Sequence, residues 1–433
     1  MTSENSNLPT ISDDLLLQCM HCGMCLPTCP TYVLTKRERS SPRGRIRLIK
    51  SVSDGKLAFS QEFIEEMNFC LDCRACETAC PAGVHYSRII DETRRVIIEK
   101  SQASLKARII RKIMLNSLFA RQNRLQTVAK LIRIYQKSGL ELLNLKFNIA
   151  GIFSRKLKML SPLAPQISSK FTYQLLPEFL PAHGESKYKV GFLTGCIQDV
   201  AFADVNYATA QVLVRNNCDV YVPRNQVCCG SVHAHSGAVE QAQQQLVQNT
   251  AAFNIDNLDF VIVNAAGCGS FLKECTDVEM KGNGEYPKIK KLASKTRDIS
   301  EFLNEINFRK PKSSLNLKVT YHDACHLVHG QKIRNSPRSI ITAIPGIKFI
   351  EMPESDWCCG SAGVYNITHT ATSFALLDRK FDNIETADAE IIVSANTGCS
   401  IQLAYGVRQR KSALKIMHPV ELLWWAYQKE NIA

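Results

Sequence analysis

The chain carries the same four-cysteine spacing twice near its N-terminus. Each run has gaps of two, two and three residues between its cysteines and ends in Cys-Pro. The first run is Cys19, Cys22, Cys25 and Cys29, and the second is Cys70, Cys73, Cys76 and Cys80. Two-residue gaps let three thiolates reach one [4Fe–4S] cluster from a tight turn, and the fourth cysteine then ligates the neighbouring cluster. The doubled run therefore predicts two clusters.

The predicted ligand sets cross between the two runs. Cluster 1 is predicted to bind Cys19, Cys22, Cys25 and Cys80, and cluster 2 to bind Cys70, Cys73, Cys76 and Cys29. A pair of zinc sites and a disulfide framework are the alternatives. Zinc sites usually use two Cys-x2-Cys pairs, not four-cysteine runs that end in proline, so the spacing favours iron–sulfur clusters.

The C-terminal part of the chain is an internal repeat. KVGFLTGC, QVCCGS and FVIVNAAGCGS are followed by KVTYHDAC, DWCCGS and IIVSANTGCS, with matching cysteines 129 to 131 positions apart. In each unit, apolar runs typical of strands lead into the cysteines, and helical stretches lie between them. Strand–helix–strand units predict parallel sheets, in which ligands gather at the carboxyl ends of the strands.

Each repeat offers four thiolates to a metal. They are Cys196, Cys228, Cys229 and Cys268 in the first unit, and Cys325, Cys358, Cys359 and Cys399 in the second. Adjacent cysteines suit one multi-iron cluster better than a strain-free disulfide, and the following glycine permits a close approach. We predict a further iron–sulfur cluster or zinc in one or both units. Eight buried structural cysteines are the alternative, while Cys218 and Cys275 lie outside the repeat and are expected in the core.

Five histidines lie close to the predicted ligands of the repeat: His233, His235, His322, His326 and His329. Each of them can ligate a metal, move a proton or form a structural hydrogen bond. The structural role is the simpler expectation for any one of them. His322 and His326 are closest to a predicted ligand, Cys325.

The sequence predicts an α/β protein of several domains. Its parts are a helical ferredoxin-like two-cluster domain (1–95), a basic helical connector (96–185), a first Cys-Cys-Gly domain (186–312) and a second one (313–433). From residue 100 to 158 there are fourteen Lys or Arg and one acidic residue, Glu141. The stretch beginning at Ser101 reads as one or two amphipathic helices. Packing on the chain's own domain is favoured over binding to an anionic membrane surface, and nucleic-acid binding is not expected.

Cysteine usage and the N-terminal sequence indicate a reducing compartment. The chain has 18 cysteines, no basic-then-apolar leader at its start and no long apolar run. We therefore expect a cytoplasmic protein, with the inner face of the cell membrane as a candidate contact.

No nucleotide or flavin fingerprint accompanies the cysteines. The sequence contains no G-x-G-x-x-G after a strand, no P-loop and no nucleophile elbow. Clusters without a site for hydride chemistry indicate an electron conductor that works with a partner. No catalytic residue is therefore assigned to this chain.

These motifs resemble the iron–sulfur subunit of bacterial glycolate oxidase. CMHCGMCLPTCPTY, SPRGRIRLIK, CLDCRACETACPAGV, NAAGCGS and HDACH are all similar to that subunit, over nearly the whole chain. The resemblance implies FAD-binding partner subunits that oxidise glycolate to glyoxylate. It also implies electron flow through this chain towards the respiratory chain, where quinone is a candidate acceptor.

Related proteins leave other functions open. The Cys-Cys-Gly domain is similar to those of lactate-utilisation proteins, anaerobic glycerol-3-phosphate dehydrogenase and heterodisulfide reductase. The fullest form of that motif ends in Cys-x2-Cys, but here Phe271 and Gln402 occupy the last position. This departure argues against a thiol–disulfide reductase. A scaffold in which metal serves only folding is a further alternative.

Overall fold

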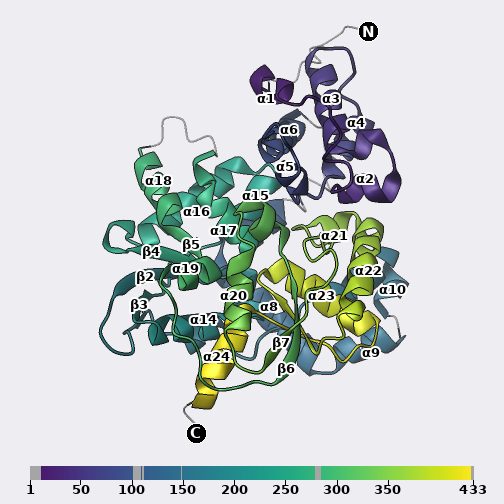
Figure 1. The fold of residues 1–433 in the computed structure, drawn as a ribbon. Coiled ribbons are helices and arrows are strands. Elements are labelled where there is room, and N and C mark those ends of the chain that lie inside the picture. The colour runs from purple at the N-terminus through teal and green to yellow at the C-terminus, as the bar shows by residue number, and fades with distance from the viewer. Residues whose placement is uncertain (1–10, 101–108, 110–111, 148, 278–283, 431–433) are drawn as a thin grey trace.

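The computed structural model describes residues 11–430 apart from 101–108, 110–111, 148 and 278–283. The first ten residues and the start of the predicted amphipathic stretch at Ser101 lie outside the described residues. Figure 1 shows the N-terminal helices at one end of the molecule and the C-terminal helix α24 at the other. Two sheets with their helices lie between these ends.

The N-terminal region is built from short helices joined by the cysteine turns. Its helices are α1 (Asp13–Leu17), α2 (Pro30–Thr35), α3 (Pro42–Ser53), α4 (Gln61–Asn68), α5 (Ala75–Thr78) and α6 (Tyr86–Lys100). Pro30 begins α2 directly after Cys29, where a missing N–H costs no hydrogen bond. Ser41 caps α3 by accepting a hydrogen bond from the Gly44 N–H (3.0 Å). A Cβ on Gly44 would lie 2.0 Å from the Glu38 carbonyl oxygen, so only glycine fits this turn.

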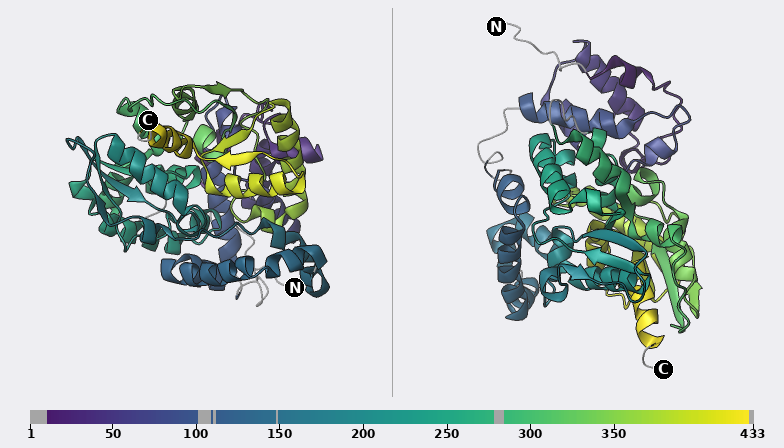
Figure 2. Two further views of the ribbon diagram at one scale, coloured as in Figure 1. Left: turned by 90° about the horizontal axis from the view of Figure 1, so that it is seen from below. Right: turned by 90° about the vertical axis from the view of Figure 1, so that its left-hand side faces the viewer.

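The connector forms a layer of helices along one side of the molecule (Figure 2). It consists of the π-helix η2 (Lys112–Phe119), α8 (Gln122–Lys137), α9 (Leu140–Phe147), α10 (Ile149–Phe153), α11 (Arg155–Leu160) and α12 (Thr172–Leu175). Ala129 of α8 packs with Phe171 of the connector and with Val200 of the first repeat. One face of α8 therefore packs on the rest of the chain, as expected for an amphipathic helix. Leu131 and Ile134 on the same helix are exposed.

The first repeat contains a five-stranded sheet in the order β1-β3-β2-β4-β5. Its strands are β1 (Phe179–Leu180), β2 (Tyr188–Leu193), β3 (Cys218–Tyr221), β4 (Phe260–Val263) and β5 (Thr296–Asp298). All neighbouring strands are parallel except β1, which pairs antiparallel with β3. Phe179 and Leu180, which lie within the predicted connector, supply an edge strand of this sheet. An edge position tolerates the flanking Pro177 and Pro181 because its outer N–H groups need no partner.

The second repeat has a four-stranded parallel sheet in the order β7-β6-β8-β9. Its strands are β6 (Leu317–His322), β7 (Ile347–Phe349), β8 (Ile391–Ser394) and β9 (Lys415–Met417). Apart from β1, the strand order matches that of the first sheet. The backbone N–H groups of Lys189 and Lys318 bond to Asp259 and Glu390 respectively, which sets the same register in both units. The predicted duplication with parallel sheets is confirmed.

Helices cover both faces of each sheet. In the first repeat they are α13 (Ile197–Ala201), α14 (Ala203–Arg215), α15 (Ser231–His235), α16 (Val239–Ala252), α17 (Ala266–Lys273), α18 (Tyr286–Lys295) and α19 (Ile299–Glu305). In the second they are α20 (Asn335–Thr342), α21 (Tyr365–Thr368), α22 (Thr370–Thr386), α23 (Thr397–Gln409) and α24 (Pro419–Glu430). One buried cluster joins Phe192 of β2, Tyr321 of β6 and Leu423 of α24, so the two repeats share a core.

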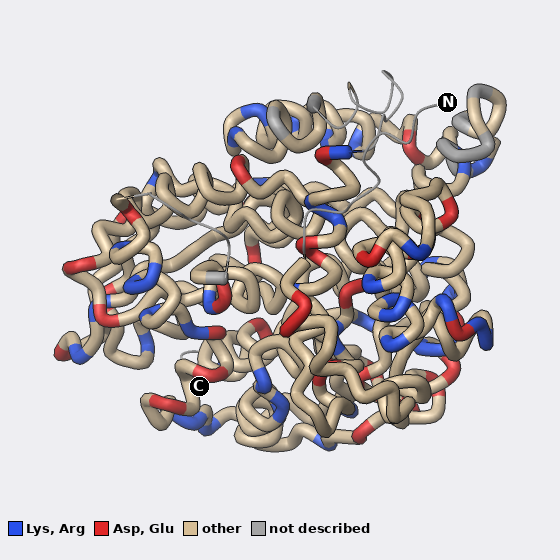
Figure 3. Tube along the Cα trace, turned by 90° about the horizontal axis from the view of Figure 1, so that it is seen from above, with Lys and Arg blue, Asp and Glu red and all other residues tan. Residues whose placement is uncertain are grey.

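The surface carries charges of both signs. Lys and Arg are interspersed with Asp and Glu over the part of the trace seen from above in Figure 3. In the described part of the chain, no helix is long and apolar enough to cross a membrane.

Candidate iron–sulfur and metal sites

The outer cysteines lie near the surface of the N-terminal region. Cys22 is exposed, and Cys19, Cys25 and Cys80 are partly exposed. The Cys19 thiol interacts electrostatically with Cys80 and Cys22, and the Cys25 thiol with Cys19. The fold therefore brings Cys80 of the second run to cysteines of the first, as the crossed ligand set requires. All eighteen cysteines are free of disulfides.

The inner cysteines line one partly open cavity, called the inner cavity below. They are Cys29, Cys70, Cys73 and Cys76. About 310 Å³ of space not filled by atoms lies there, part of it open to solvent. Burial raises the pKa of Cys73 and Cys76 well above the ordinary thiol value, so a bound cation must hold them as thiolates. Four convergent sulfurs around a cavity fit a cluster, while the ligation itself remains a prediction.

Both cysteine runs use the same backbone path. His21 and Gly23 have positive φ angles in the first run, and Asp72 and Arg74 have positive φ angles at the matching positions of the second. The left-handed residues on either side of the second cysteine of each run turn the chain back sharply. This explains physically how two-residue gaps direct three sulfurs to one point.

A buried arginine lies beside the inner cavity. Arg45 is fully buried on α3, and its guanidinium donates to the Glu66 carbonyl (3.0 Å), the Glu66 carboxylate (3.1 Å) and the Thr31 hydroxyl (3.1 Å). Burial opposes its charge, but Tyr86, Cys70 and Cys29 keep its pKa above the ordinary arginine value.

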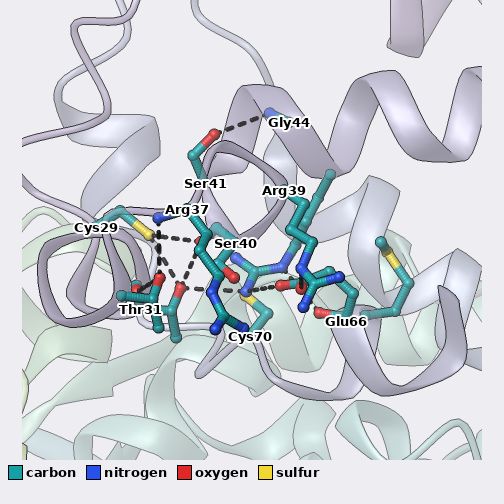
Figure 4. A network of polar contacts seen from close by, with 12 residues as sticks. Cys29, Thr31, Arg37, Arg39, Ser40, Ser41, Gly44, Glu66 and Cys70 are labelled. Atoms are coloured by element: carbon teal, nitrogen blue, oxygen red, sulfur yellow. Dashed lines mark hydrogen bonds and ion pairs between the residues drawn. The ribbon is translucent and has the colours of Figure 1, made fainter. Parts of the chain in front are cut away.

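The network extends to a cluster cysteine. Thr31 donates to the Ser40 carbonyl (2.7 Å) and lies 3.3 Å from the Cys29 sulfur (Figure 4). In the sequence, SPRGRIRLIK contributes only to the family resemblance, and no role is predicted for Arg45. Nothing in the sequence around Arg45 distinguishes it from the neighbouring basic residues Arg43 and Arg47.

The four cysteines of the first repeat also meet. Their thiols interact in series, Cys196 with Cys228, Cys228 with Cys229, and Cys229 with Cys268. Cys196 follows β2, and Cys228 and Cys229 lie in the turn before α15. Cys268 lies in the first turn of α17, which follows β4. The cysteines therefore lie at the carboxyl ends of parallel strands, as expected. Cys218 is buried in a separate core cluster, whereas Cys275 is buried in the apolar cluster that also contains Cys228 and Cys229.

The second repeat gathers its cysteines in the same way, next to the inner cavity. The thiols of Cys325 and Cys358, of Cys358 and Cys359, and of Cys359 and Cys399 interact in the same series. Cys73 shares a buried cluster with Cys358, and Cys325 packs against it. The sequence indicated no contact between the second cysteine run and the second repeat. The two sites are neighbours in space although about 250 residues separate them in the sequence.

A polar bridge joins the second cysteine run to both repeats. His235 of the first repeat forms ion pairs with Asp72 (3.0 Å) and Asp91 (3.3 Å). His326 of the second repeat donates to the Asp72 carbonyl (3.0 Å). Burial opposes the charges, yet the pairing lowers the pKa of the Asp72 carboxyl and raises the pKa of His235. The pairing therefore favours the ionised forms of both groups.

The remaining histidines divide into two kinds. His233 donates to the Leu115 carbonyl (2.9 Å), and His329 lies 3.0 Å from the Thr78 hydroxyl. These two histidines, like His235 and His326, have structural partners. This agrees with the expectation that each histidine forms a structural hydrogen bond. His322 differs, since neither of its ring nitrogens makes a hydrogen bond of ordinary geometry to the described residues.

Structural side chains fill the positions where a fifth cysteine would stand. Phe271 is buried among the apolar residues around Cys228 and Cys229. Gln402 is fully buried and bonds to Asn366 (3.2 Å) and Ser373 (2.9 Å). Both positions therefore belong to the packing, and each repeat offers four thiolates.

Comparison with known proteins agrees with this arrangement. Residues 15–84 match the 4Fe-4S dicluster domain, and residues 190–273 and 319–404 match the cysteine-rich domain. The chain is 37% identical over 414 residues to the probable glycolate oxidase iron-sulfur subunit of Bacillus subtilis, covering 94% of this chain and 93% of that protein. The chain belongs to the family of glycolate oxidase iron–sulfur subunits. The predicted resemblance and the iron–sulfur cofactors are thus confirmed.

Other relatives fit this family in different ways. The glycolate oxidase iron-sulfur subunit of Escherichia coli is 31% identical over 97% of this chain and 96% of its own length. Residues 106–164 match the linker region of the glycolate oxidase iron-sulfur subunit, which places the helical connector in the family. Lactate utilization protein A of Oceanobacillus iheyensis is 29% identical but covers only 54% of this chain.

A Gly360→Ala substitution in this family member is expected to destabilise the second repeat by about 3 kcal/mol. A Cβ at residue 360 would lie 2.4 Å from the Ser373 carbonyl oxygen, and the residue has φ +86°. Gly363→Ala is the matched control, because φ is +62° there and no atom lies within 4 Å of the added Cβ. The control should cost about 1 kcal/mol. Chemical denaturation measures both values, and equal losses would contradict the proposed close approach.

Proposed function

We propose that this chain is the electron-transfer subunit of a flavin-dependent glycolate oxidase that converts glycolate to glyoxylate. The observation that carries the proposal is similarity over nearly the full length to subunits of that name, combined with clustered thiolates. Iron–sulfur clusters supply one-electron transfer, whereas a hydroxy acid loses two electrons with its hydride. The flavin therefore belongs to a partner subunit, and this chain carries electrons towards the respiratory chain.

The residue assignments belong to the same proposal. Cluster 1 is held by Cys19, Cys22, Cys25 and Cys80, and cluster 2 by Cys70, Cys73, Cys76 and Cys29. The electrostatic neighbours of Cys19 and the cysteine-lined inner cavity support these sets. The division at residues 95, 185 and 312, with a ferredoxin-like helical domain first, is proposed with them. We place the protein in the cytoplasm.

The flavoprotein is proposed to dock at the outer cysteines. Leu17, Met20 and Met24 around this run expose 68%, 69% and 60% of their surface. Exposed apolar side chains beside an exposed cluster ligand suit a partner that needs a short path for electrons. The inner cysteines, which lie against the second repeat, are out of reach of such a partner.

The connector is proposed to contact the inner face of the membrane, where quinone is available. Leu131, Ile134, Leu142, Phe147 and Ile152 are exposed on α8 to α10. Lys and Arg lie among them with a single acidic residue, Glu141. An apolar and basic helical surface is the type that binds anionic lipid headgroups.

Reconstitution tests the proposed function. The chain alone is expected to show no oxidation of glycolate, because none of its motifs binds flavin. The flavoprotein subunits alone should reduce a small dye but transfer electrons to quinone at least tenfold more slowly than the complete complex. Lactate and glycerol 3-phosphate are assayed in parallel. Glycolate oxidation by the isolated chain, or quinone reduction that does not need it, would contradict the proposal.

The lactate alternative has weaker support. The lactate utilization proteins A that match this chain correspond to only about half of it. Two relatives that match over nearly their full length carry the glycolate oxidase name.

A further inference from the structure

The two repeats differ at one position that faces their cysteines. Strand β2 ends at Leu193 and strand β6 ends at His322, each three residues before the first cysteine of its repeat. Leu193 shares a buried cluster with Cys228 and Cys229. The second repeat therefore has an imidazole where the first has an apolar side chain against its thiols.

The His322 ring points at sulfur ligands. It is 1% exposed, and a ring nitrogen lies within 4.8 Å of the Cys359 and Cys399 sulfurs. The backbone of Ser355 is a further polar neighbour of the ring, but neither ring nitrogen makes a hydrogen bond of ordinary geometry within the described residues. A histidine that ligates a metal commonly gives its other N–H to a backbone carbonyl, which fixes the tautomer. A buried imidazole without such a partner is available to a metal.

A second difference between the repeats adds positive charge at the same place. Asn249 on α16 bonds to the Cys228 carbonyl (3.0 Å) and the Val227 N–H (2.8 Å), next to the first Cys-Cys pair. Lys380 is its counterpart on α22 and donates to the carbonyls of Glu354 (2.5 Å) and Ser355 (3.1 Å). The buried ammonium interacts with Cys358 and Cys359. A buried positive charge beside thiols favours their thiolate forms, which are the forms that ligate a metal.

We propose that the second repeat holds a metal centre ligated by the His322 imidazole together with the Cys359 and Cys399 thiolates. One further thiolate, from Cys358 or Cys325, completes the four ligands that zinc takes, while an iron–sulfur centre can use both. In the described part of the first repeat only thiols gather at the corresponding place. Thiolate with imidazole suits zinc, and it also occurs in iron–sulfur centres, where histidine raises the potential. The proposal concerns this chain's ligands and does not depend on which hydroxy acid the complex oxidises.

The first test is metal analysis of the full-length chain purified without oxygen. His322→Leu copies the residue of the first repeat, so the volume of the side chain is nearly kept. We expect it to lose the metal of the second repeat, with at least ~10-fold weaker affinity, while the iron of the N-terminal clusters stays. His329→Leu is the matched control, because His329 is also buried but bonds to Thr78. It should keep the full metal content.

The second test uses the unmodified chain, so its result does not depend on whether a variant folds. If the metal is zinc, X-ray absorption should show nitrogen at about 2.0–2.1 Å beside sulfur at about 2.3 Å. If it is iron, pulsed EPR should detect a nitrogen coupling that changes with 15N-histidine labelling. The element that these measurements detect at the site, iron or zinc, identifies the bound metal. Ligation by sulfur alone, or full metal content in His322→Leu, would overturn the proposal.

Discussion

A Cys29→Ser variant is expected to lose the cluster bound by the second cysteine run, although Cys29 belongs to the first. Cys29 lines the inner cavity with Cys70, Cys73 and Cys76, and its sulfur is buried. A serine oxygen is a poor ligand for a cluster that prefers thiolate. Total iron should fall by about four atoms per chain. Quinone reduction by the complete complex should fall by a factor of about 100 or more.

Spectroscopy identifies the cluster that is lost. The EPR signal of the outer cluster should persist in Cys29→Ser, and the reverse variant, Cys80→Ser, should remove that signal and keep the inner one. Cys218→Ser is the control, because Cys218 lies in the core away from both sites. If Cys29→Ser abolished the outer signal alone, the crossed assignment would be wrong.

An Arg45→Gln variant is expected to lower both the stability of the N-terminal region and the reduction potential of the inner cluster. Removing the guanidinium leaves the Glu66 carboxylate buried without its main partner, which costs about 3–5 kcal/mol. A unit charge at ~7 Å in a medium of dielectric ~20 is worth ~2.4 kcal/mol, or ~100 mV for one electron. Loss of this positive charge disfavours the reduced state.

Redox titration and denaturation measure the two effects separately. The matched control is Arg39→Gln, because Arg39 also pairs with Glu66 (3.4 Å) but is 57% exposed. An exposed pair of this kind contributes less than about 1 kcal/mol, and its charge is screened by water. Equal potentials in Arg45→Gln and the unmodified chain would show that Arg45 acts only through packing.

The features predicted well from the sequence depend on short-range spacing. The gaps between Cys19 and Cys29 are imposed by the sulfur positions around a cluster, so the residues themselves carry the signal. The same is true of the repeat, where an apolar strand leads into each cysteine. Parallel sheets follow because such strands must be covered on both faces.

The features that the sequence did not predict depend on contacts between distant residues. No periodicity links Cys73 to Cys358, and the antiparallel edge strand at Phe179 is too short to show alternation. His322 was identified as a candidate, but only the fold shows that it lacks structural partners while His326 has one. Arg45 looked like one basic residue among several until its burial was known.

The positive φ angles at Asp72 and Arg74 have a consequence for how the protein matures. Such conformations cost non-glycine residues about 1–3 kcal/mol each, and here contacts with His235, His326 and Glu274 offset that cost. The outer turn is held locally instead, by Arg43 donating to the His21 carbonyl (2.8 Å). During synthesis the cysteine runs leave the ribosome long before the repeats. The inner cluster is therefore expected to be secured only after the last third of the chain has folded, so that assembly of the cofactor reports completion of the polypeptide.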